Sequence, residues 1–210
     1  MEDLYRGRLA ALEQTWEVWT SLGHDLSEDQ WSAATRCTGW DVAAVYAHHS
    51  ATARDLDAPL PRTDAPGKPV TAAEIIRRFN APDGVAHTMA EPNADQAVAD
   101  AAEHPRRELV ERFGVHGPGA LRQLRELAAT LVIPWPASGA VVAVGEAIRI
   151  ILMEATVHLL DVQRALDLAP DVPPAALRDT ALLLAEVAPA VELIEAATGR
   201  SPHSPLPVLR

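Results

Sequence analysis

Apolar residues recur at helical spacing over most of the chain. Between residues 4 and 22 they follow one another at steps of three and four, the period of a helix with one buried face. The same pattern predicts further helices over residues 41–56, 71–79, 96–113, 118–131, 141–168 and 173–198. No segment shows a convincing strand alternation. We therefore predict an all-α protein, a helix bundle with an additional C-terminal helix.

Local signals mark where several of these helices begin. Ser27 with Gln30, and Thr71 with Glu74, have the residue types and spacing of a capping box. Asp41 directly precedes the second long apolar pattern, and aspartate is a preferred N-cap residue. These three positions predict helix starts near residues 28, 42 and 72.

The breaks between the patterns suggest how the chain is divided. Residues 57–70 contain four prolines and predict a surface loop, while residues 81–95 are polar and broken. Pro105 interrupts the weakly patterned 96–113 segment. We expect residues 1–170 to form the bundle, and residues 171–210 to form a C-terminal helix and irregular tail packed on it.

The helix predicted over residues 141–168 carries two ionisable residues on its apolar face. We expect its polar stripe to face solvent, and that stripe comprises Glu146, Arg149, Thr156, Gln163, Arg164 and Asp167. Glu154 and His158 lie on the opposite side with Ala147, Ile150, Ile151 and Ala165. There, an uncompensated ionisable pair costs several kcal/mol. One turn apart, a carboxylate and an imidazole can share a divalent cation, so we predict that Glu154 and His158 are metal ligands. The alternative is a buried ion pair that orders the core.

A third ligand would come from another helix, and two adjacent histidines are candidates. His49 falls on the clearest apolar stripe of the 41–56 helix, whereas His48 lies to one side of it. A histidine bonded to a backbone carbonyl in the core is the ordinary explanation for either residue. Helical phase does not decide which of them faces Glu154 and His158.

Two motifs resemble the signatures of a known family. The first is Trp31, then Thr35-x-Cys37-x-Gly39-Trp40-x-Val42, then Ala47-His48. The second is Glu154-x-x-x-His158-x-x-Asp161. Together, over roughly residues 4–200, they resemble the mycothiol-dependent maleylpyruvate isomerase family, whose members are four-helix bundles of the DinB-like superfamily.

The resemblance implies a metal site and a thiol co-substrate. Members bind a divalent metal, usually zinc, through one histidine of the second helix and a Glu–His pair of the last bundle helix. The family register places these ligands at His48, Glu154 and His158. Asp161, one turn beyond His158, is in a position to accept the second N–H of that histidine, and the alternative is an aspartate at the edge of the stripe. Trp40 is a candidate for lining the thiol pocket, and the alternative is core packing at the start of the helix.

The implied activity is thiol chemistry. A three-ligand zinc site keeps an open position, where a thiol such as mycothiol becomes a thiolate and attacks an electrophilic small molecule. The outcome is S-transfer or cis–trans isomerisation. The alternative is a non-catalytic DinB-like bundle that binds a small ligand or a partner in the same cavity. The isomerase that names the family continues into a C-terminal domain, and this chain ends shortly after its last predicted helix, so the reaction is left open.

Composition narrows the partners and the compartment. The 210-residue chain has a formal net charge of −11, which disfavours nucleic acid, and no apolar run long enough to predict a membrane span. The acidic N-terminus lacks the pattern of a signal peptide, so we expect a cytoplasmic protein. The single cysteine, Cys37, excludes an intramolecular disulfide.

We expect Arg106, Arg107 and Arg112 to lie on a solvated face. An alanine-rich helical surface would also suit a homodimer.

Overall fold

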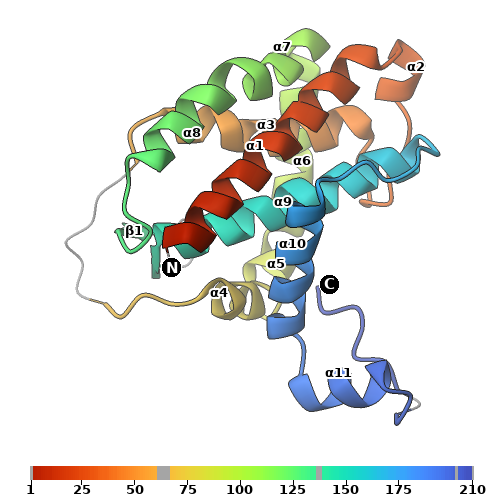
Figure 1. The fold of residues 1–210 in the computed structure, drawn as a ribbon. Coiled ribbons are helices and arrows are strands. Elements are labelled where there is room, and N and C mark those ends of the chain that lie inside the picture. The colour runs from red at the N-terminus through yellow and green to blue at the C-terminus, as the bar shows by residue number, and fades with distance from the viewer. Residues whose placement is uncertain (1, 61–66, 136–138, 202, 210) are drawn as a thin grey trace.

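The computed structural model describes residues 2–60, 67–135, 139–201 and 203–209. It consists of helices and one short hairpin (Figure 1). The first half contains α1 (Glu2–Asp25), α2 (Glu28–Trp31), α3 (Val42–Asp57), α4 (Ala72–Phe79), α5 (Val85–Thr88) and α6 (Ala90–Glu103). The second half contains α7 (Arg106–Glu111), the π-helical turn η1 (Arg112–His116), α8 (Gly117–Arg125), β1 (Val132–Pro134), β2 (Val141–Ala143), α9 (Val144–Ala165), α10 (Pro174–Val187) and α11 (Ala190–Ala197).

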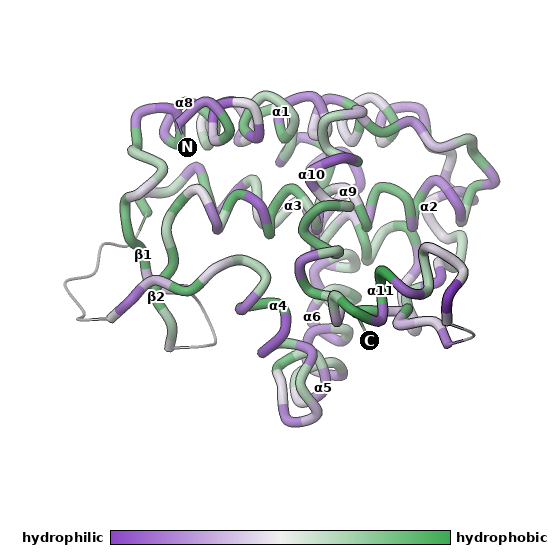
Figure 2. Tube along the Cα trace, turned by 60° about the horizontal axis from the view of Figure 1, so that its bottom comes forward, coloured by the Kyte–Doolittle hydropathy of each residue, from purple (hydrophilic) through white to green (hydrophobic). Residues whose placement is uncertain are grey.

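Four helical segments form the bundle that the sequence predicts. They are α1, α3, α9 and the continuous run from α7 through η1 to α8. In Figure 2, hydrophobic and hydrophilic residues alternate along α1 and α8, as expected for helices with one buried face. The prediction of an all-α bundle is therefore confirmed.

Aromatic side chains fill the centre of this bundle. The Trp19 ring lies 4.7 Å from Tyr46 and 5.3 Å from Phe113, measured between ring centroids. Their polar atoms are satisfied by backbone carbonyls, because Tyr46 donates to Trp19 and Trp19 Nε1 donates to Ala155. These bonds join α1 to α3 and to α9, the two helices that carry the predicted ligands.

The three helix starts predicted from capping residues agree with the structure, in which α2, α3 and α4 begin at Glu28, Val42 and Ala72. The Ser27 hydroxyl accepts the N–H of Gln30, and the Gln30 side chain accepts the N–H of Ser27, which completes the capping box. Asp41 accepts the N–H of Ala44 at 2.8 Å and begins α3. Thr71 accepts the N–H of Glu74 at the start of α4.

The middle of the chain differs from the prediction. Helix α8 ends at Arg125 rather than near residue 131, and α9 begins at Val144 rather than at 141. Between them, β1 and β2 pair antiparallel, with Val132 opposite Ala143. The β-branched residues of this segment favour an extended backbone, although the runs are too short to show an alternating pattern. Residues 61–66 of the predicted loop and residues 136–138 lie outside the described part of the chain.

Two further expectations are corrected. The helix predicted over residues 173–198 is divided into α10 and α11 near Pro189, since proline cannot continue the hydrogen-bond ladder. The segment 81–95, expected to be broken, contains α5 and the start of α6.

Only part of the predicted polar stripe faces solvent: Arg164 and Asp167 are exposed. Arg149, Thr156 and Gln163 are buried, and α10 packs against α9. The Arg149 guanidinium makes two 2.9 Å bonds to the Glu186 carboxylate of α10. The Gln163 side chain donates to the Asp171 carbonyl and accepts its N–H. Arg149 and Gln163 are therefore polar because they pair with the C-terminal segment.

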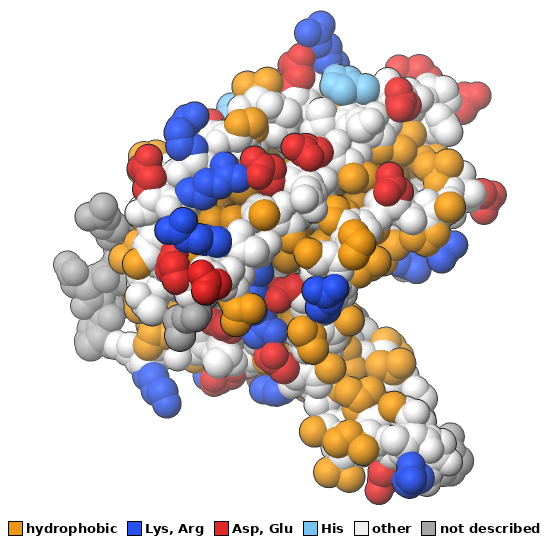
Figure 3. Space-filling view, viewed as in Figure 1, with side chains coloured by type: hydrophobic (Ala, Val, Ile, Leu, Met, Phe, Trp, Pro, Cys, Tyr) orange, Lys and Arg blue, Asp and Glu red, His pale blue; other side chains and the backbone are white. Residues whose placement is uncertain are grey.

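Of the two C-terminal helices, only α11 stands away from the bundle. Helix α10 contacts α9, α1 and α4, whereas α11 lies at its far end and contains no buried residue (Figure 1). Figure 3 shows hydrophobic side chains gathered on these two helices, where Leu182, Val191 and Ile194 are exposed. Among the described residues, no helix is both long enough and apolar enough to cross a membrane.

Candidate metal centre

Two neighbouring bundle helices bring the predicted ligands together. Helix α3 carries His48, and α9 carries Glu154 and His158 one turn apart. One donor atom from each of the three side chains lies within 4.8 Å of those of the other two. Oε2 of Glu154 is 3.3 Å from Nε2 of His158. Residues more than a hundred positions apart thus form one compact cluster of metal-type donors.

The structure places His48 in this cluster and His49 outside it. His49 is 1% exposed and its ring lies 5.2 Å from Trp19 and 5.5 Å from Phe113, within the aromatic core. Helical phase places His49 on the clearest apolar stripe of this helix, and His49 is indeed the more buried of the two histidines. The ligand position of the family register, His48, is the one that faces α9.

The cluster opens to solvent on the side of Glu154. The Glu154 side chain is 43% exposed, against 14% for His158. Glu154, which helical phase places among apolar residues, is therefore only partly buried. The carboxylate is therefore the more accessible side of the Glu154–His158 pair.

The two histidines of the cluster differ in their electrostatic surroundings. Burial, followed by the charge of His158, lowers the pKa of His48 to about 4, so this imidazole is neutral at pH 7. Burial opposes a charge on His158 as well, but hydrogen bonds to Asp161, Cys37 and Glu154 outweigh it and raise its pKa. The centre thus has a neutral nitrogen donor on one side and a positive charge held by carboxylates on the other.

Asp161 lies behind His158, on the side away from Glu154. Its Oδ2 is 3.0 Å from Nδ1 of His158, and its side chain is only 6% exposed. Asp161 also accepts a 2.5 Å bond from Nε of Arg36 and a 3.2 Å contact from Sγ of Cys37. Sequence reasoning missed Arg36, which occupies a variable position of the motif and lies 125 residues from Asp161.

Trp40 covers the two imidazoles. Its ring centroid lies 4.8 Å from that of His48 and 5.9 Å from that of His158. The indole therefore forms an apolar wall of the centre. Whether a thiol binds against it stays a prediction.

The donor set fits a divalent cation. Two imidazole nitrogens and one carboxylate are a common ligand set for catalytic zinc, in which a fourth position stays open. Ligating histidines usually donate their second N–H to a carboxylate, as His158 can to Asp161. A neutral His48 supplies a free lone pair without first losing a proton.

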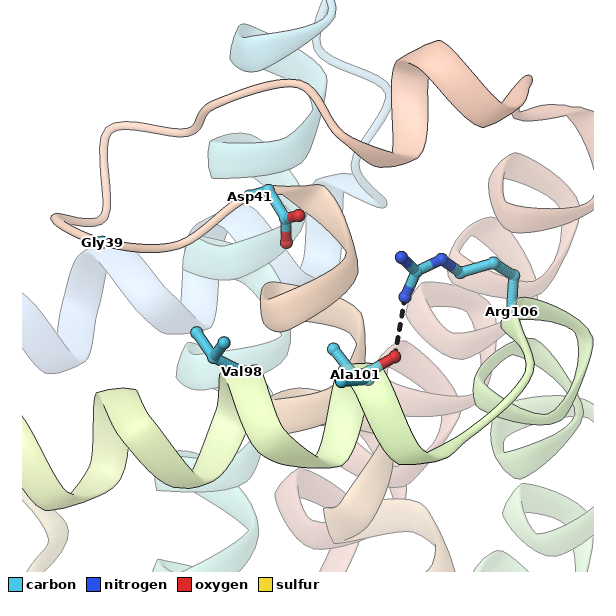
Figure 4. Close-up of a pocket in the computed structure, with 6 residues that line it drawn as sticks. Gly39, Asp41, Val98, Ala101 and Arg106 are labelled. Carbon is cyan, nitrogen blue, oxygen red and sulfur yellow. Dashed lines mark hydrogen bonds between the residues drawn. The ribbon is translucent and has the colours of Figure 1, made fainter.

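A separate hollow is lined in part by Gly39 of the Gly39–Trp40 turn. It encloses about 260 Å³ and is lined by Gly39, Asp41, Val98, Ala101, Ala102 and Arg106 (Figure 4). Arg106 is already engaged, because its guanidinium donates to the Ala101 carbonyl at 2.9 Å and lies 5.8 Å from the Trp31 ring. The predicted metal ligands do not line this hollow.

Comparison with known proteins identifies the family of the chain. A family model described as the mycothiol maleylpyruvate isomerase N-terminal domain matches residues 12–163. No curated protein and no solved structure matches the chain. The matched segment runs from within α1 through most of α9 and includes His48, Glu154, His158 and Asp161. The chain therefore belongs to the mycothiol maleylpyruvate isomerase N-terminal domain family.

Proposed function

We propose that this protein is a metal-dependent enzyme that activates a low-molecular-weight thiol similar to mycothiol. The thiol would then attack an electrophilic small molecule, giving S-transfer or isomerisation. His48, Glu154 and His158 are the proposed ligands of a divalent cation, with zinc as the first candidate. The observation that carries the proposal is the convergence of these three donors at an opening, with Asp161 behind His158.

The side chains around the centre have separate roles in this proposal. When a cation binds, His158 would lose the proton at Nε2, while Asp161 would hold the remaining proton at Nδ1, so that the Nε2 lone pair faces Glu154 and His48. The half-exposed Glu154 leaves one side of the centre open for the thiol and the electrophile. Trp40 limits water on the side of the imidazoles and offers an apolar surface to the substrates.

A divalent cation bound at such a site stabilises the thiolate of a ligating thiol and so lowers the pKa of that thiol. With that chemistry supplied, the chain needs no dedicated base to deprotonate the nucleophile. Its own residues bind the two reactants close together and hold the ligand imidazoles in place. Proximity of this kind removes much of the entropic barrier of a bimolecular step.

The metal part of the proposal is tested by elemental analysis of the purified protein. We expect about one equivalent of a divalent metal in the wild type and its loss in His158→Ala, because removing one of three ligands leaves too few donors. The exposed His87 provides a matched control, and His87→Ala should keep the metal. Unchanged metal content in His158→Ala would show that the ligands are assigned wrongly.

The thiol part is tested by turnover. The metal-loaded protein is mixed with mycothiol and a panel of activated alkenes, and loss of free thiol and isomerisation of the alkene are followed separately. We expect metal-dependent consumption or isomerisation that is absent from His158→Ala. A fully metallated protein that is inactive across the panel would favour the non-catalytic binding bundle.

A further inference from the structure

The segment that joins α2 to α3 forms a closed turn beside the metal centre. The Thr35 hydroxyl donates to the Trp40 carbonyl at 2.9 Å and accepts the N–H of Cys37 at 3.1 Å. The N–H of Trp40 donates to the Cys37 carbonyl at 3.0 Å. Gly39 has a φ of +81°, a conformation in which other residues are strained. These bonds make residues 35–40 a defined unit, which we call the clamp loop.

The clamp loop directs two side chains at the same carboxylate. Nε of Arg36 lies 2.5 Å from Oδ1 of Asp161, and Sγ of Cys37 lies 3.2 Å from Oδ2. Oδ2 also faces Nδ1 of His158 at 3.0 Å. Both oxygens of a side chain that is 6% exposed are therefore engaged, which fixes the plane of the carboxylate.

This arrangement suits a hydrogen-bond support better than a second metal site. The donor atoms of Cys37, His158 and Asp161 also lie within 4.8 Å of one another. However, the Arg36 guanidinium is bonded directly to Asp161, and its positive charge opposes a cation at that position. On the Nδ1 side of His158, the side chains of Arg36, Cys37 and Asp161 are therefore joined by hydrogen bonds. The Nε2 side of the same ring faces Glu154 and His48, the proposed metal ligands.

We propose that Arg36 and Cys37 are positioning residues that act through Asp161 to hold the His158 ring in its metal-binding orientation. This inference rests on the proposed function, since it assumes a cation at His48, Glu154 and His158. Trp40 of the same loop lies against both imidazoles, so the loop that supports His158 also covers the centre. Thr35 and Gly39 then shape the loop, Arg36 and Cys37 hold Asp161, and Trp40 covers the imidazoles.

Cobalt binding by the full chain tests the inference, because Co²⁺ reports both affinity and ligand geometry through its visible absorption. We expect Arg36→Met to weaken Co²⁺ affinity by about tenfold, the lower end for removal of a group outside the ligands, and to alter the absorption bands. Arg36→Lys should restore part of the loss, because it keeps the charge but loses the planar fork. Cys37→Ser keeps a hydrogen donor and should stay close to wild type, whereas Cys37→Ala should weaken binding.

A double-mutant cycle separates action through Asp161 from a general structural effect. If Arg36 acts through Asp161, Arg36→Met causes a much smaller further loss of Co²⁺ affinity in an Asp161→Asn background than in the wild type. The matched control is Arg107→Met, which breaks a 2.6 Å ion pair with Glu111 on α7 and should leave affinity and absorption unchanged. Thermal unfolding without metal verifies that each variant is folded.

The possible failures are distinguishable. If the wild type binds no cobalt, the proposed function fails and this inference fails with it. If the wild type binds cobalt and Arg36→Met binds it equally well, or the Arg36 and Asp161 effects add in full, the inference alone is wrong and the metal site stands. A folded Arg36→Met variant with weaker binding, altered bands and a non-additive cycle supports it.

Discussion

At the scale of single residues, the buried guanidinium of Arg112 shows how a local pattern can mislead. Arg112 is only 2% exposed, whereas the sequence places it on a solvated face. Its nitrogens lie 2.7 and 3.4 Å from the two oxygens of Asp100. Asp100 belongs to α6, which packs on α3, the helix that carries His48. This ion pair therefore links η1 to α6, which packs against the helix that carries His48.

The pair predicts a pH-dependent contribution to stability. Burial raises the pKa of Asp100, but hydrogen bonds and charge from Arg112 outweigh it and lower the pKa below its ordinary value of 3.8. A lowered pKa gives stability that is complete above the unfolded-state pKa and is lost as pH falls through the folded-state pKa. We expect Asp100→Asn to lower the free energy of unfolding by about 2 kcal/mol at pH 7. The difference from wild type should narrow below about pH 4, as urea unfolding at a series of pH values would measure.

Asp95 offers the control on the same helix. It is exposed on α6, so Asp95→Asn should change the free energy of unfolding by less than about 0.5 kcal/mol at any pH. A constant difference between Asp100→Asn and wild type from pH 7 to pH 3 would contradict the assignment of the effect to this carboxylate.

At the scale of elements, the sequence predicts what short-range contacts decide. Ser27 and Asp41 cap helices through bonds to residues three positions away, so these starts can be located from neighbours alone. The apolar period likewise identifies α1, α3 and α9. Contacts between distant segments determine which polar side chains are buried and which side chains face one another. A local sequence pattern does not predict these contacts.

The errors follow the same division. Arg149 pairs with Glu186 of α10, and Gln163 pairs with Asp171 just before α10. Both residues therefore resemble solvent-facing residues in the sequence although they are buried. Packing of His49 against Trp19 and Phe113 decides which histidine turns toward α9, and helical phase cannot report that packing. His48 could be selected only through resemblance to a family.

Close packing of α1 gives a prediction at this scale. An added Cβ at Gly23 would lie 2.5 Å from Cγ2 of Val110 and 3.0 Å from Cε1 of Tyr46. We expect Gly23→Ala to lower the free energy of unfolding by about 1–2 kcal/mol, because overpacking outweighs the better helix propensity of alanine. Gly7, on the same helix, has no atom within 4 Å of its added Cβ. Gly7→Ala should therefore stabilise the protein by up to about 1 kcal/mol. Equal stabilisation by both substitutions in urea unfolding would show that α1 has room at Gly23.

At the scale of the whole molecule, the candidate centre exists only in the folded bundle. The clamp loop, α3 and α9 each contribute to it, and Arg36 and Asp161 are 125 positions apart in the chain. In an unfolded chain these donors are separated and bind a cation much more weakly. Any cation that binds the assembled centre therefore adds its binding free energy to the stability of the fold.

This linkage predicts a thermal midpoint that depends on metal concentration. At a free zinc concentration of one hundred times Kd, binding to the folded state alone adds about 2.7 kcal/mol. For a chain of this length, that free energy corresponds to a rise of roughly 5–10 °C in the midpoint of unfolding. The midpoint should continue to rise with the logarithm of zinc concentration and should return to its metal-free value with a chelator. His158→Ala should show no such rise, whereas His87→Ala should behave as wild type, because His87 lies outside the centre. Equal shifts in the wild type and in His158→Ala would show that zinc binds the surface, since such binding does not need the three converging ligands.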